Sequence, residues 1–478
     1  MSIKESTTTK DQVAQEDACI ADLIGRGRAA MAKFVNADQE TIDDAVTALA
    51  WAIYQPDRAK ELAEIAVRDT GLGNVEDKFT KNRRKTFGTL RDLLREDART
   101  TGIIEELPER GLVKYAKPVG VVAAVCPSTN PAATPVNKSM FAIKGRNAVV
   151  VAPSPAGLST TTRVVEMMRA ELARVGHPRD MVQVLPQVSK SLTQKLMEAS
   201  DLVVATGSQD NVRRAYRSGR PAIGVGVGNV PVIVDETADC RDAAEKICMS
   251  KTFDNATSCS SENAIVIVDK AYDAMIAALE DVGGYLVNAD EKQKVQNNLW
   301  IEGKLNPHMI ATDAYVFAEI AGLPEVARRA KFFLIEETGV GKGYPFSGEK
   351  LSLALAIYRV ASFEDAIDLV RRILAYQGIG HSCGLHSTKA DHMRRLAEEL
   401  DVVRVLINQA HAIGNGGAFD NGLNFTLSMG CGTWAGNSIT ENLSYRNFIN
   451  VTHLSNVIPD ETPKENELFS SYIKQHGR

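Results

Sequence analysis

The chain has 478 residues, of which 44% are hydrophobic and 24% are charged, and its formal net charge is −5. This composition is close to the average for soluble globular proteins, and the length predicts two or three domains. The small net charge excludes a strong field for nucleic acid or a membrane surface. No stretch approaches the roughly 18 apolar residues of a membrane span. We therefore expect an enzyme whose partners include neither nucleic acid nor a membrane.

The cysteines and the first residues indicate the compartment. The seven cysteines are odd in number and lack a paired CxxC spacing, which favours reduced thiols over a disulfide framework. The start, MSIKESTTTKDQVAQED, is polar and lacks the apolar core of a secretory signal. We predict a cytoplasmic protein in which residues 1–20 form a flexible tail.

The first hundred residues have a helical pattern. Apolar residues recur near the 3.6-residue period over Ile20–Phe34 and again over Ile42–Ile53. The segment Lys78–Arg95 is strongly basic, but its charges alternate with apolar residues such as Phe87 and Leu94 at helical spacing. This pattern favours a solvated helix face over a nucleic-acid patch.

After Gly102, short apolar strands alternate with amphipathic helices. The predicted strands are Val119–Val125, Ala148–Ala152, Met181–Leu185 and Asp201–Ala205, and the helices between them are Pro131–Lys144, Thr160–Val175 and Leu192–Ala199. Such alternation predicts an α/β fold with a parallel sheet covered on both faces. Ligands bind at the carboxyl ends of the strands in these sheets. The segments Cys126–Asn130, Ala152–Pro155 and Thr206–Ser208 fall at these ends.

A second α/β unit follows a glycine-rich segment, Gly224–Pro231. This segment is not a GxGxxG fingerprint, because no third glycine stands at the required place. The predicted elements after it are the strand Val232–Val234, the helix Cys240–Ser250, the strand Ala264–Val268 and the helix Ala271–Leu279. We place a domain boundary near Val234. Outside the alternation, Glu105–Lys117 has the pattern of an extended hairpin, Asn447–Leu454 that of a late strand, and Asn415–Gly436 that of a loop.

Cys259 stands among small residues, in Asn255–Glu262, directly before a predicted buried strand. A cysteine on a tight turn with small neighbours can be approached closely by a substrate, as a nucleophile must be. The alternative is a buried structural thiol, which is the commoner fate of a lone cysteine.

Several short motifs, in order, resemble those of the coenzyme A-acylating branch of the aldehyde dehydrogenase superfamily, from about residue 20 to residue 455. They are Pro127–Pro131, Lys144–Asn147, Ala152–Pro155, Thr206–Ser208, Gly224–Pro231, Cys259–Glu262, Glu349–Ser352, Gly380–Ser382 and Gly430–Asn442. The resemblance implies an aldehyde dehydrogenase-like α/β fold. Its parts would be a Rossmann-like cofactor domain, an α/β catalytic domain that carries the cysteine, and a small β oligomerisation element.

On this basis we expect an NAD(P)-binding domain over residues 21–234 and a catalytic domain over residues 235–430. Residues 431–478 would hold an oligomerisation strand and a tail. In the family, the oligomerisation element pairs a hairpin with a late strand, here about residues 105–117 and Asn447–Leu454. The resemblance implies a homodimer or a homotetramer.

The resemblance also implies catalytic residues. Cys259 matches the family's nucleophile, which forms a thiohemiacetal and then a thioester. A free thiol ionises near pKa 8.5, and no residue in the sequence clearly supplies help for its ionisation. Asn130 matches the asparagine whose amide stabilises the oxyanion, a contribution of about 2.7–4 kcal/mol. An asparagine that caps the helix beginning near Pro131 is the alternative.

The implied cofactor is NAD or NADP. Glu349 matches the glutamate that holds the nicotinamide ribose, and the other implied contacts are Pro153, Ser154, Thr206, Gly207, Ser208 and Gly226. The lysine and the glutamate of the family's KPSE-like motif are both missing from Ala152–Pro155. Loss of the glutamate removes a negative charge that would repel the 2′-phosphate of NADP, whereas loss of the lysine removes a positive charge that would attract it. Val212 replaces the glycine expected five places after Gly207, which weakens the case for pyrophosphate contacts through that helix.

Val225 is the most informative departure. Hydrolytic members of the family carry at this position a glutamate that activates the deacylating water, so hydrolysis of the thioester should be slow here. A thiol needs less help, because a few per cent of it is thiolate at neutral pH. The sequence therefore predicts transfer of the acyl group to coenzyme A as co-substrate.

Within the branch, stretches such as TGSQDNVRRAY and FDNATSCSSENA are most similar to acylating enzymes of sulfoacetaldehyde. Enzymes of succinate semialdehyde are the runner-up, and acetaldehyde is a further alternative. The first two substrates have an anionic tail, so we expect a basic or hydroxyl-rich pocket; Thr257, Ser258 and Ser260 flank the nucleophile. An alternative from a different functional class is a catalytically inactive scaffold protein that binds a nucleotide.

The histidines and the other cysteines add little. His381 suits either a base in acyl transfer or a structural role on its turn. The remaining histidines and cysteines have no ligand spacing, so no metal site is predicted.

Overall fold

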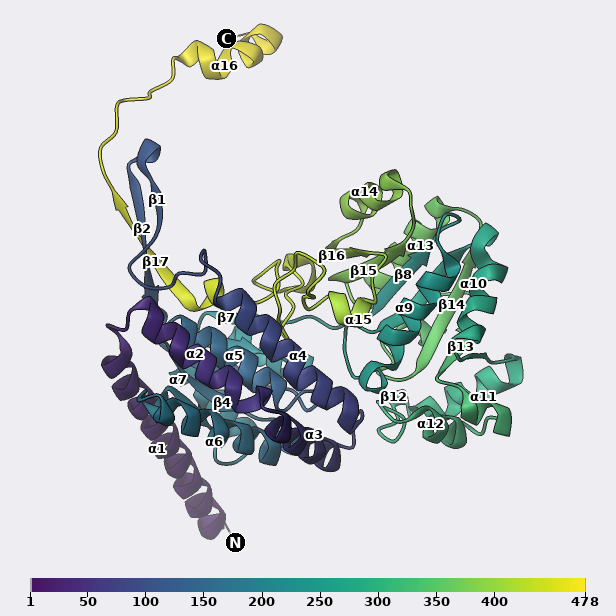
Figure 1. Cartoon of the computed structure of the whole chain (residues 1–478), viewed down its shortest axis with the longest axis horizontal. Coiled ribbons are helices and arrows are strands. Elements are labelled where there is room, and N and C mark those ends of the chain that lie inside the picture. Colours follow the sequence, from purple (N-terminus) through teal and green to yellow (C-terminus); the bar gives the residue numbers. More distant parts are fainter. Residues whose placement is uncertain (1, 478) are drawn as a thin grey trace.

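The computed structural model of the chain describes the backbone of residues 2–477 and the side chains of residues 11–477 (Figure 1). Within this range the strands form two parallel sheets, a projecting three-stranded antiparallel sheet, and a short hairpin of β11 (Trp300–Ile301) with β12 (Lys304–Leu305). In Figure 1 the two parallel sheets and their helices form two bodies side by side.

The N-terminal part of the chain is helical, as its periodicity predicted. Its helices are α1 (Ser2–Phe34), α2 (Gln39–Tyr54), α3 (Pro56–Thr70) and α4 (Val75–Leu93). The prediction of a flexible tail over residues 1–20 is wrong, because α1 continues through the described part of that range. Ile20 and Leu23 of α1 are buried against the first sheet, and the Glu16 carboxylate accepts a hydrogen bond of 2.6 Å from the Ser191 hydroxyl.

The first parallel sheet has the order β5-β4-β3-β6-β7. Its strands are β3 (Val121–Val125), β4 (Ala148–Ala152), β5 (Val182–Val184), β6 (Leu202–Ala205) and β7 (Ala222–Gly224), and its helices are α5 (Ala133–Lys144), α6 (Leu158–Arg174), α7 (Lys190–Ala199) and α8 (Gln209–Arg217). Alternate residues of β3 and β4 are buried on opposite faces, one under α2, α5 and α6 and the other under α1 and α7. The predicted strands and helices of this unit are confirmed.

The second parallel sheet has the order β10-β13-β14-β9-β8-β15-β16. Its strands are β8 (Val230–Val234), β9 (Glu262–Val268), β10 (Gly284–Leu286), β13 (Phe332–Glu336), β14 (Ala354–Val360), β15 (Gly380–His386) and β16 (Val402–Ile407). The helices that accompany it are α9 (Cys240–Thr252), α10 (Asp269–Asp281), α11 (Ala289–Leu299), α12 (Ala314–Ala321), α13 (Phe363–Tyr376), α14 (Ala390–Glu399) and α15 (His411–Gly414).

The strand that follows the glycine-rich segment belongs to the second sheet. β8 pairs with β9 on one side and with β15 on the other. The predicted domain boundary near Val234 is therefore wrong, because it assigns β8 to the first sheet. The chain passes from one sheet to the other over residues 225–229. An apolar parallel strand has the same composition in either sheet, so only its hydrogen-bond partners identify its place.

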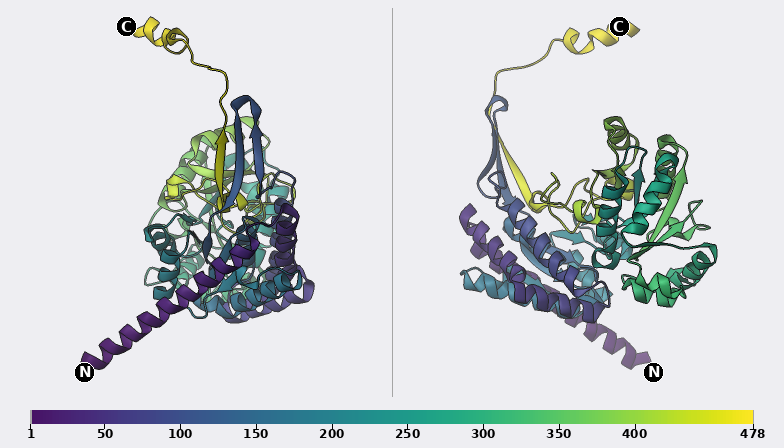
Figure 2. Two further views of the ribbon diagram at one scale, coloured as in Figure 1. Left: turned by 90° about the vertical axis from the view of Figure 1, so that its left-hand side faces the viewer. Right: turned by 45° about the vertical axis from the view of Figure 1, so that its right-hand side comes forward.

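The predicted hairpin and late strand meet in the projecting sheet. β1 (Ile103–Leu107), β2 (Leu112–Pro118) and β17 (Ile449–Ser455) pair antiparallel in that order, with Ala116 opposite Val451. Figure 2 shows this sheet extending from the body, followed by a linker and the terminal helix α16 (Glu465–His476). Most of β17 is exposed, and its outer edge has no strand partner within the described chain.

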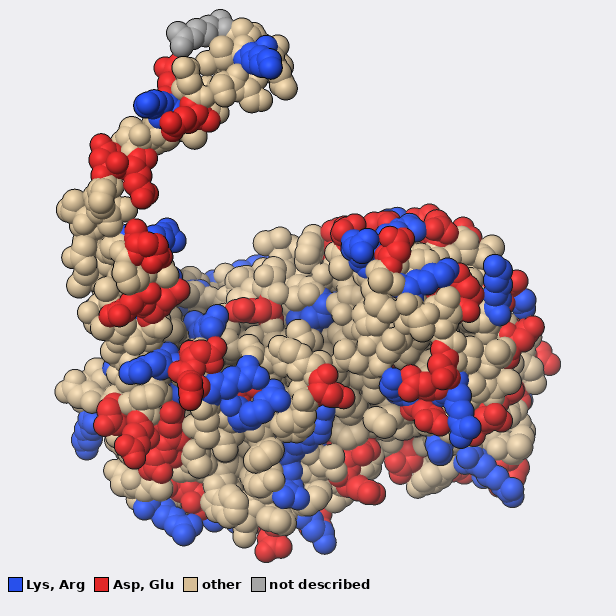
Figure 3. All heavy atoms as spheres, turned by 45° about the horizontal axis from the view of Figure 1, so that its top comes forward, with Lys and Arg blue, Asp and Glu red and all other residues tan. Residues whose placement is uncertain are grey.

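The charged side chains do not form a face of one sign. Figure 3 shows acidic and basic groups interspersed over the side that it presents. Among residues 2–477, no helix combines the length and the apolar character needed to span a membrane.

The carboxyl edge of the first parallel sheet faces the amino edge of the second, and these two edges form a junction. β7 ends at Gly224 and β8 begins at Val230, so residues 225–229 connect the carboxyl edge of the first sheet to the amino edge of the second. Cys259 precedes β9 at that same amino edge. The segments after β3, β4 and β6, where the sequence predicted ligand contacts, end at the carboxyl edge that faces it.

Candidate active site

Cys259 lies at the end of a tight turn between α9 and β9. Asp254, Asn255 and Ala256 all have left-handed φ angles, of 51°, 52° and 59°. Cys259 itself is partly exposed. A Cβ atom on Gly228 would lie 2.5 Å from the Cβ of Cys259, so only glycine allows the glycine-rich segment to pack this closely on that residue.

The strained turn is anchored by Asp254. Its carboxylate accepts hydrogen bonds from Lys78 Nζ (3.0 Å), Lys81 Nζ (2.5 Å) and Thr257 Oγ1 (2.7 Å), while its main-chain N–H donates to Asp77 (2.7 Å). Burial alone would raise the pKa of Asp254, but Lys81 and Lys78 hold it below its usual value. Left-handed residues other than glycine cost of order 1–3 kcal/mol each, and these bonds offset that cost.

Lys78 also connects the turn to Asn130. Its Nζ donates to the Thr129 carbonyl oxygen (3.2 Å), next to Asn130. The Asn130 side-chain amide lies 3.4 Å from the Thr129 hydroxyl and makes no cap to α5, whose N-cap residue is Ala132. The helix-capping alternative for this side chain is therefore not what the structure has.

A buried arginine lies behind the thiol. Arg404 donates from Nε to Asn415 Oδ1 (3.0 Å) and from Nη2 to the carbonyl oxygens of His381 and Gly430 (both 2.9 Å). Although the residue is partly exposed, desolvation of its thiol and, to a smaller extent, the charge of Glu349 raise the pKa of Cys259 to about 12, with Arg404 opposing them. The resting thiol is consequently protonated at neutral pH.

His381 is buried beside this arginine. Its Nδ1 shares a hydrogen bond of 2.7 Å with the Ser382 hydroxyl, and its Nε2 has no partner within the described residues. Burial, with Arg404 and His411 nearby, lowers the pKa of His381 well below its usual value, so the ring is neutral.

The predicted cofactor residues of the first sheet cluster at its carboxyl edge. Pro153 and Ser154 follow β4, and the Ser154 hydroxyl is buried with no partner among the described residues. Thr206 and Gly207 follow β6; Thr206 shares a hydrogen bond of 2.6 Å with Ser428, and Gly207 has a φ of 137°. Ser208 begins α8 as its N-cap. An orphaned buried hydroxyl at this edge fits a ribose or phosphate oxygen of a dinucleotide.

Gly226 and Glu349 lie on the other side of the junction. A Cβ on Gly226 would be 2.9 Å from the Sγ of Cys431. Glu349 is fixed by its neighbour Lys350, whose Nζ donates to the carbonyl oxygens of Asn263 (2.9 Å) and Gly348 (2.8 Å). Burial raises the pKa of Glu349 to about 8, with Lys350 opposing. No donor of the described chain reaches this carboxylate, which fits a role as acceptor for a ribose diol.

The chain matches the model of the aldehyde dehydrogenase family over residues 5–295. It is 51% identical over 470 residues to the sulfoacetaldehyde dehydrogenase (acylating) of Cupriavidus necator, covering 98% of this chain and 95% of that relative. The chain belongs to the aldehyde dehydrogenase family.

Solved structures of the family are similar over nearly the whole chain. The acetylating aldehyde dehydrogenase of Geobacillus thermoglucosidasius has a TM-score of 0.89 and 34% identity, over 95% of this chain and 99% of that one. The propionaldehyde dehydrogenase of Rhodopseudomonas palustris, with bound CoA and an acylated cysteine, has a TM-score of 0.81 and 25% identity, over 92% and 97%. The predicted fold class is confirmed, and the protein is an oxidoreductase of the aldehyde dehydrogenase type.

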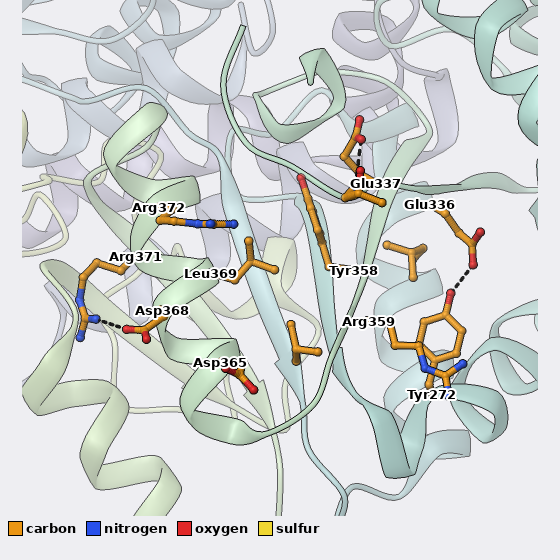
Figure 4. A pocket seen from close by; sticks show the side chains of 13 residues that line it. Tyr272, Glu336, Glu337, Tyr358, Arg359, Asp365, Asp368, Leu369, Arg371 and Arg372 are labelled. Atoms are coloured by element: carbon orange, nitrogen blue, oxygen red, sulfur yellow. Dashed lines mark hydrogen bonds and ion pairs between the residues drawn. The ribbon is translucent and has the colours of Figure 1, made fainter. Parts of the chain in front are cut away.

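A cavity of about 800 Å³ lies away from Cys259, which is not among its lining residues. It lies where β13 and β14 end, at the carboxyl edge of the second sheet (Figure 4). Its Tyr272 hydroxyl donates to Glu336 (2.5 Å), and its Arg371 pairs with Asp368 (2.5 Å). A second cavity, of about 710 Å³, is lined in part by Glu349 and by Gln377, whose carbonyl oxygen accepts a hydrogen bond from Asn229 (3.1 Å).

The solvent exposure of the basic residues of α4 differs from what the sequence pattern predicted. Lys78, Lys81 and Lys85 are only 4%, 6% and 8% exposed, whereas Phe87 is 49% exposed. The prediction of a solvated basic face is therefore wrong. The spacing of these lysines, which repeat every three or four residues, was the available signal that they share one helix face.

Proposed function

We propose that this aldehyde dehydrogenase is an acylating enzyme that oxidises sulfoacetaldehyde with NAD or NADP and transfers the acyl group to coenzyme A, forming sulfoacetyl-CoA. The observation that carries the proposal is Val225, a buried valine in the segment that packs on Cys259 through Gly228. The name of the Cupriavidus necator relative supports the same substrate.

The first chemical step belongs to Cys259. The thiol adds to the aldehyde: its sulfur bonds to the carbonyl carbon, the C=O π bond breaks, and the thiol proton passes to the oxygen through solvent, which gives a thiohemiacetal. The Asn130 amide donates to the oxygen on which negative charge develops. A bound nicotinamide supplies the acceptor for the hydride that leaves this carbon, so that the Cys259 adduct becomes a thioester.

The second step is acyl transfer. The thiol of coenzyme A attacks the thioester carbonyl and releases Cys259. Water competes poorly, because Val225 offers no carboxylate to take its proton. The thiolate fraction of coenzyme A can attack without a protein base; the buried His381, whose pKa lies well below its usual value, is a weak base.

The chain's own residues suit a dinucleotide. Ser154, Thr206 and Ser208 offer hydroxyl groups at the carboxyl edge of the first sheet, and Glu349 offers a carboxylate for the nicotinamide ribose. With neither a lysine nor a glutamate in Ala152–Pro155, these contacts suit NAD and NADP alike.

We further propose that the first sheet with its helices is the cofactor domain and that the second sheet is the catalytic domain. The sheet of β1, β2 and β17 would join subunits into a homodimer or a homotetramer. The exposed, unpaired edge of β17 supports this role, because such edges pair readily with other strands. The free thiols of all seven cysteines, each within the described residues, support a cytoplasmic location.

The assay that tests the proposal measures NAD(P)H formation from sulfoacetaldehyde, succinate semialdehyde and acetaldehyde, with and without coenzyme A. We expect the highest kcat/KM with sulfoacetaldehyde and a strict requirement for coenzyme A. Equal rates without coenzyme A would overturn the acylating assignment. Preference for succinate semialdehyde would favour the runner-up, and Cys259→Ala with wild-type activity would establish another nucleophile.

A further inference from the structure

A basic stripe on α4 faces the loop that covers the nucleophile. Lys81, Arg84 and Lys85 are spaced three and four residues apart and therefore lie on one side of the helix. Gly88 continues this side, and its lack of a side chain leaves room for the Phe425 ring. Phe425 belongs to the loop of residues 415–436.

The stripe carries more positive than negative charge. Lys85 donates to the carbonyl oxygens of Gly416 (2.8 Å) and Gly417 (3.4 Å), and Arg84 to that of Ile413 (3.4 Å). Within the described chain, neither Arg84 nor Lys85 forms an ion pair; burial lowers the pKa of Arg84, and the exposed Asp420 opposes this only in part.

The other acids nearby already have partners. Lys78 and Lys81 share the single carboxylate of Asp254. Asp92, further along α4, pairs with Arg91 and Arg95 (2.8 and 3.1 Å).

Buried charge without a counter-ion is costly. Burial lowers the pKa of Lys85 to about 7, with Arg84 and Lys81 adding to the effect, and burial lowers the pKa of Lys78 to about 8. An anion bound at the stripe would supply the missing charge and keep these lysines protonated.

The stripe also reaches both sides of the nucleophile. The Lys81 Nζ lies 3.4 Å from the Thr257 hydroxyl, two residues before Cys259. The loop that Lys85 holds begins at Asn415, whose amide donates to the Ser260 hydroxyl (3.0 Å), one residue after Cys259. An aldehyde attached to Cys259 would therefore lie between two segments that the side chains of α4 contact, directly or through the loop that begins at Asn415.

We propose that Lys81, Arg84 and Lys85 form an anion subsite that binds the charged tail of the aldehyde. The inference rests on the proposed function and adds the residues that select an anionic substrate. A sulfonate has three acceptor oxygens, which suits several donors arranged around one group. A carboxylate tail and a phosphate of coenzyme A share this chemistry, so the test has to separate them.

The test compares Lys85→Met with the wild type on sulfoacetaldehyde, succinate semialdehyde and propionaldehyde, a neutral aldehyde. Loss of a charged hydrogen-bond donor should lower kcat/KM for sulfoacetaldehyde about tenfold to hundredfold, mainly through KM. The ratio of kcat/KM for sulfoacetaldehyde to that for propionaldehyde should fall at least about tenfold. Lys85→Arg should restore most of this ratio, and Lys60→Met, on an exposed lysine of α3, should leave it unchanged.

Several outcomes would contradict the proposed anion subsite. An equal loss on the charged and neutral aldehydes would mean that Lys85 is structural. A raised KM for coenzyme A with an unchanged KM for the aldehyde would assign the stripe to a coenzyme A phosphate. If Lys85→Met does not fold, Arg84→Leu, on a half-buried side chain, is judged by the same ratio.

A binding measurement keeps this inference separate from the proposed reaction. Ethanesulfonate should bind the full-length wild-type protein, as measured by calorimetry, and its Kd should rise at least about tenfold in Lys85→Met. Binding with no CoA-dependent turnover of any aldehyde would reject the proposed function and retain the subsite. Activity on sulfoacetaldehyde with an unchanged Kd in the variant would reject the subsite alone.

Discussion

The protonation of Cys259 is set by its surroundings at the scale of single residues. Burial and the nearby Glu349 both raise the pKa of its thiol, and Arg404 only partly compensates. The resting enzyme therefore keeps its nucleophile as a thiol. Glu349 has a raised pKa of about 8 of its own, so it is mostly neutral at pH 7 and becomes an opposing negative charge at higher pH.

Glu349→Gln should make Cys259 ionise more readily at alkaline pH. At pH 9 the wild-type glutamate is charged and disfavours the thiolate, whereas glutamine is neutral, so alkylation of Cys259 by iodoacetamide should be about threefold to tenfold faster in the variant. Below pH 7 the difference should shrink, because the wild-type carboxyl is then protonated. Mass spectrometry of the Cys259 peptide gives the rates, with Glu319→Gln as an exposed control. Identical rates at pH 9 would show that Glu349 does not act on the thiol.

Val225→Glu tests whether the lack of a carboxylate at residue 225 slows hydrolysis of the acyl-enzyme and so favours acyl transfer to coenzyme A. A carboxylate at this position could take a proton from water, so formation of free acid without coenzyme A should rise about tenfold or more, within the range of general base catalysis. Product analysis by chromatography separates free acid from acyl-CoA. Val225→Gln has a similar size and no basic group, and it should produce no such increase. Equal hydrolysis in the two variants would contradict the argument.

At the scale of elements, α4 connects the parts of the active site. It belongs to the N-terminal helices, yet its lysines bond to the Thr129 loop, the Asp254 turn and the loop at Gly416. These three segments come from distant parts of the sequence; the Asp254 turn leads directly to Cys259, and Asn415, next to Gly416, bonds to Ser260. A single rigid helix can therefore fix their relative positions more accurately than the loops could by themselves.

Lys78→Met should separate catalysis from binding. The change removes the link between Asp254 and Thr129 but leaves Lys81 on the carboxylate, so the cost in unfolding free energy should be about 1–3 kcal/mol. We expect kcat to fall about tenfold or more, since small displacements of reacting groups are costly, while KM for the dinucleotide changes little. Urea unfolding and steady-state kinetics measure the two effects. A stability loss with unchanged kcat would show that Lys78 supports the fold without positioning Asn130.

At the scale of the whole molecule, the active site lies where two sheets meet, and the projecting sheet lies apart from it. β17 begins directly after Phe448, whose carbonyl oxygen accepts a hydrogen bond from Asn147 (2.7 Å). The projecting sheet of β1, β2 and β17 is thus hydrogen-bonded to the first sheet just before β17 begins, and the outer edge of β17 is free to pair with another subunit.

Truncation after Phe448 should abolish oligomerisation. It removes β17, the strand with the free edge, and keeps the buried Phe448. Light scattering coupled to size-exclusion chromatography should give a monomer for this variant and a dimer or tetramer for the full chain. Truncation after Ser455 removes the linker and α16 but keeps β17, and it should retain the full-length state. An oligomer in both variants would place the subunit interface elsewhere.

Local pattern was enough to predict most of the helices and strands. β3 and β4 are continuous apolar runs, and α5 and α6 have a clear helical period, so neighbouring residues alone identify them. Cys259 and Val225 were also accessible, because short motifs carry their chemistry. The predicted ligand segments after β3, β4 and β6 lie at one sheet edge, as parallel topology requires.

What only the tertiary structure decided depends on contacts between residues far apart in the chain. β8 belongs to the second sheet because it pairs with β15, about 150 residues later. Lys78 and Lys81 are buried because they meet Asp254, more than 170 residues away. A basic helix face in sequence shows charge but not what covers it. The sequence by itself therefore determined the fold class and, through the family resemblance, the proposal that Cys259 is the nucleophile and that Val225 replaces a water-activating base, whereas only long-range packing decided which charges surround Cys259.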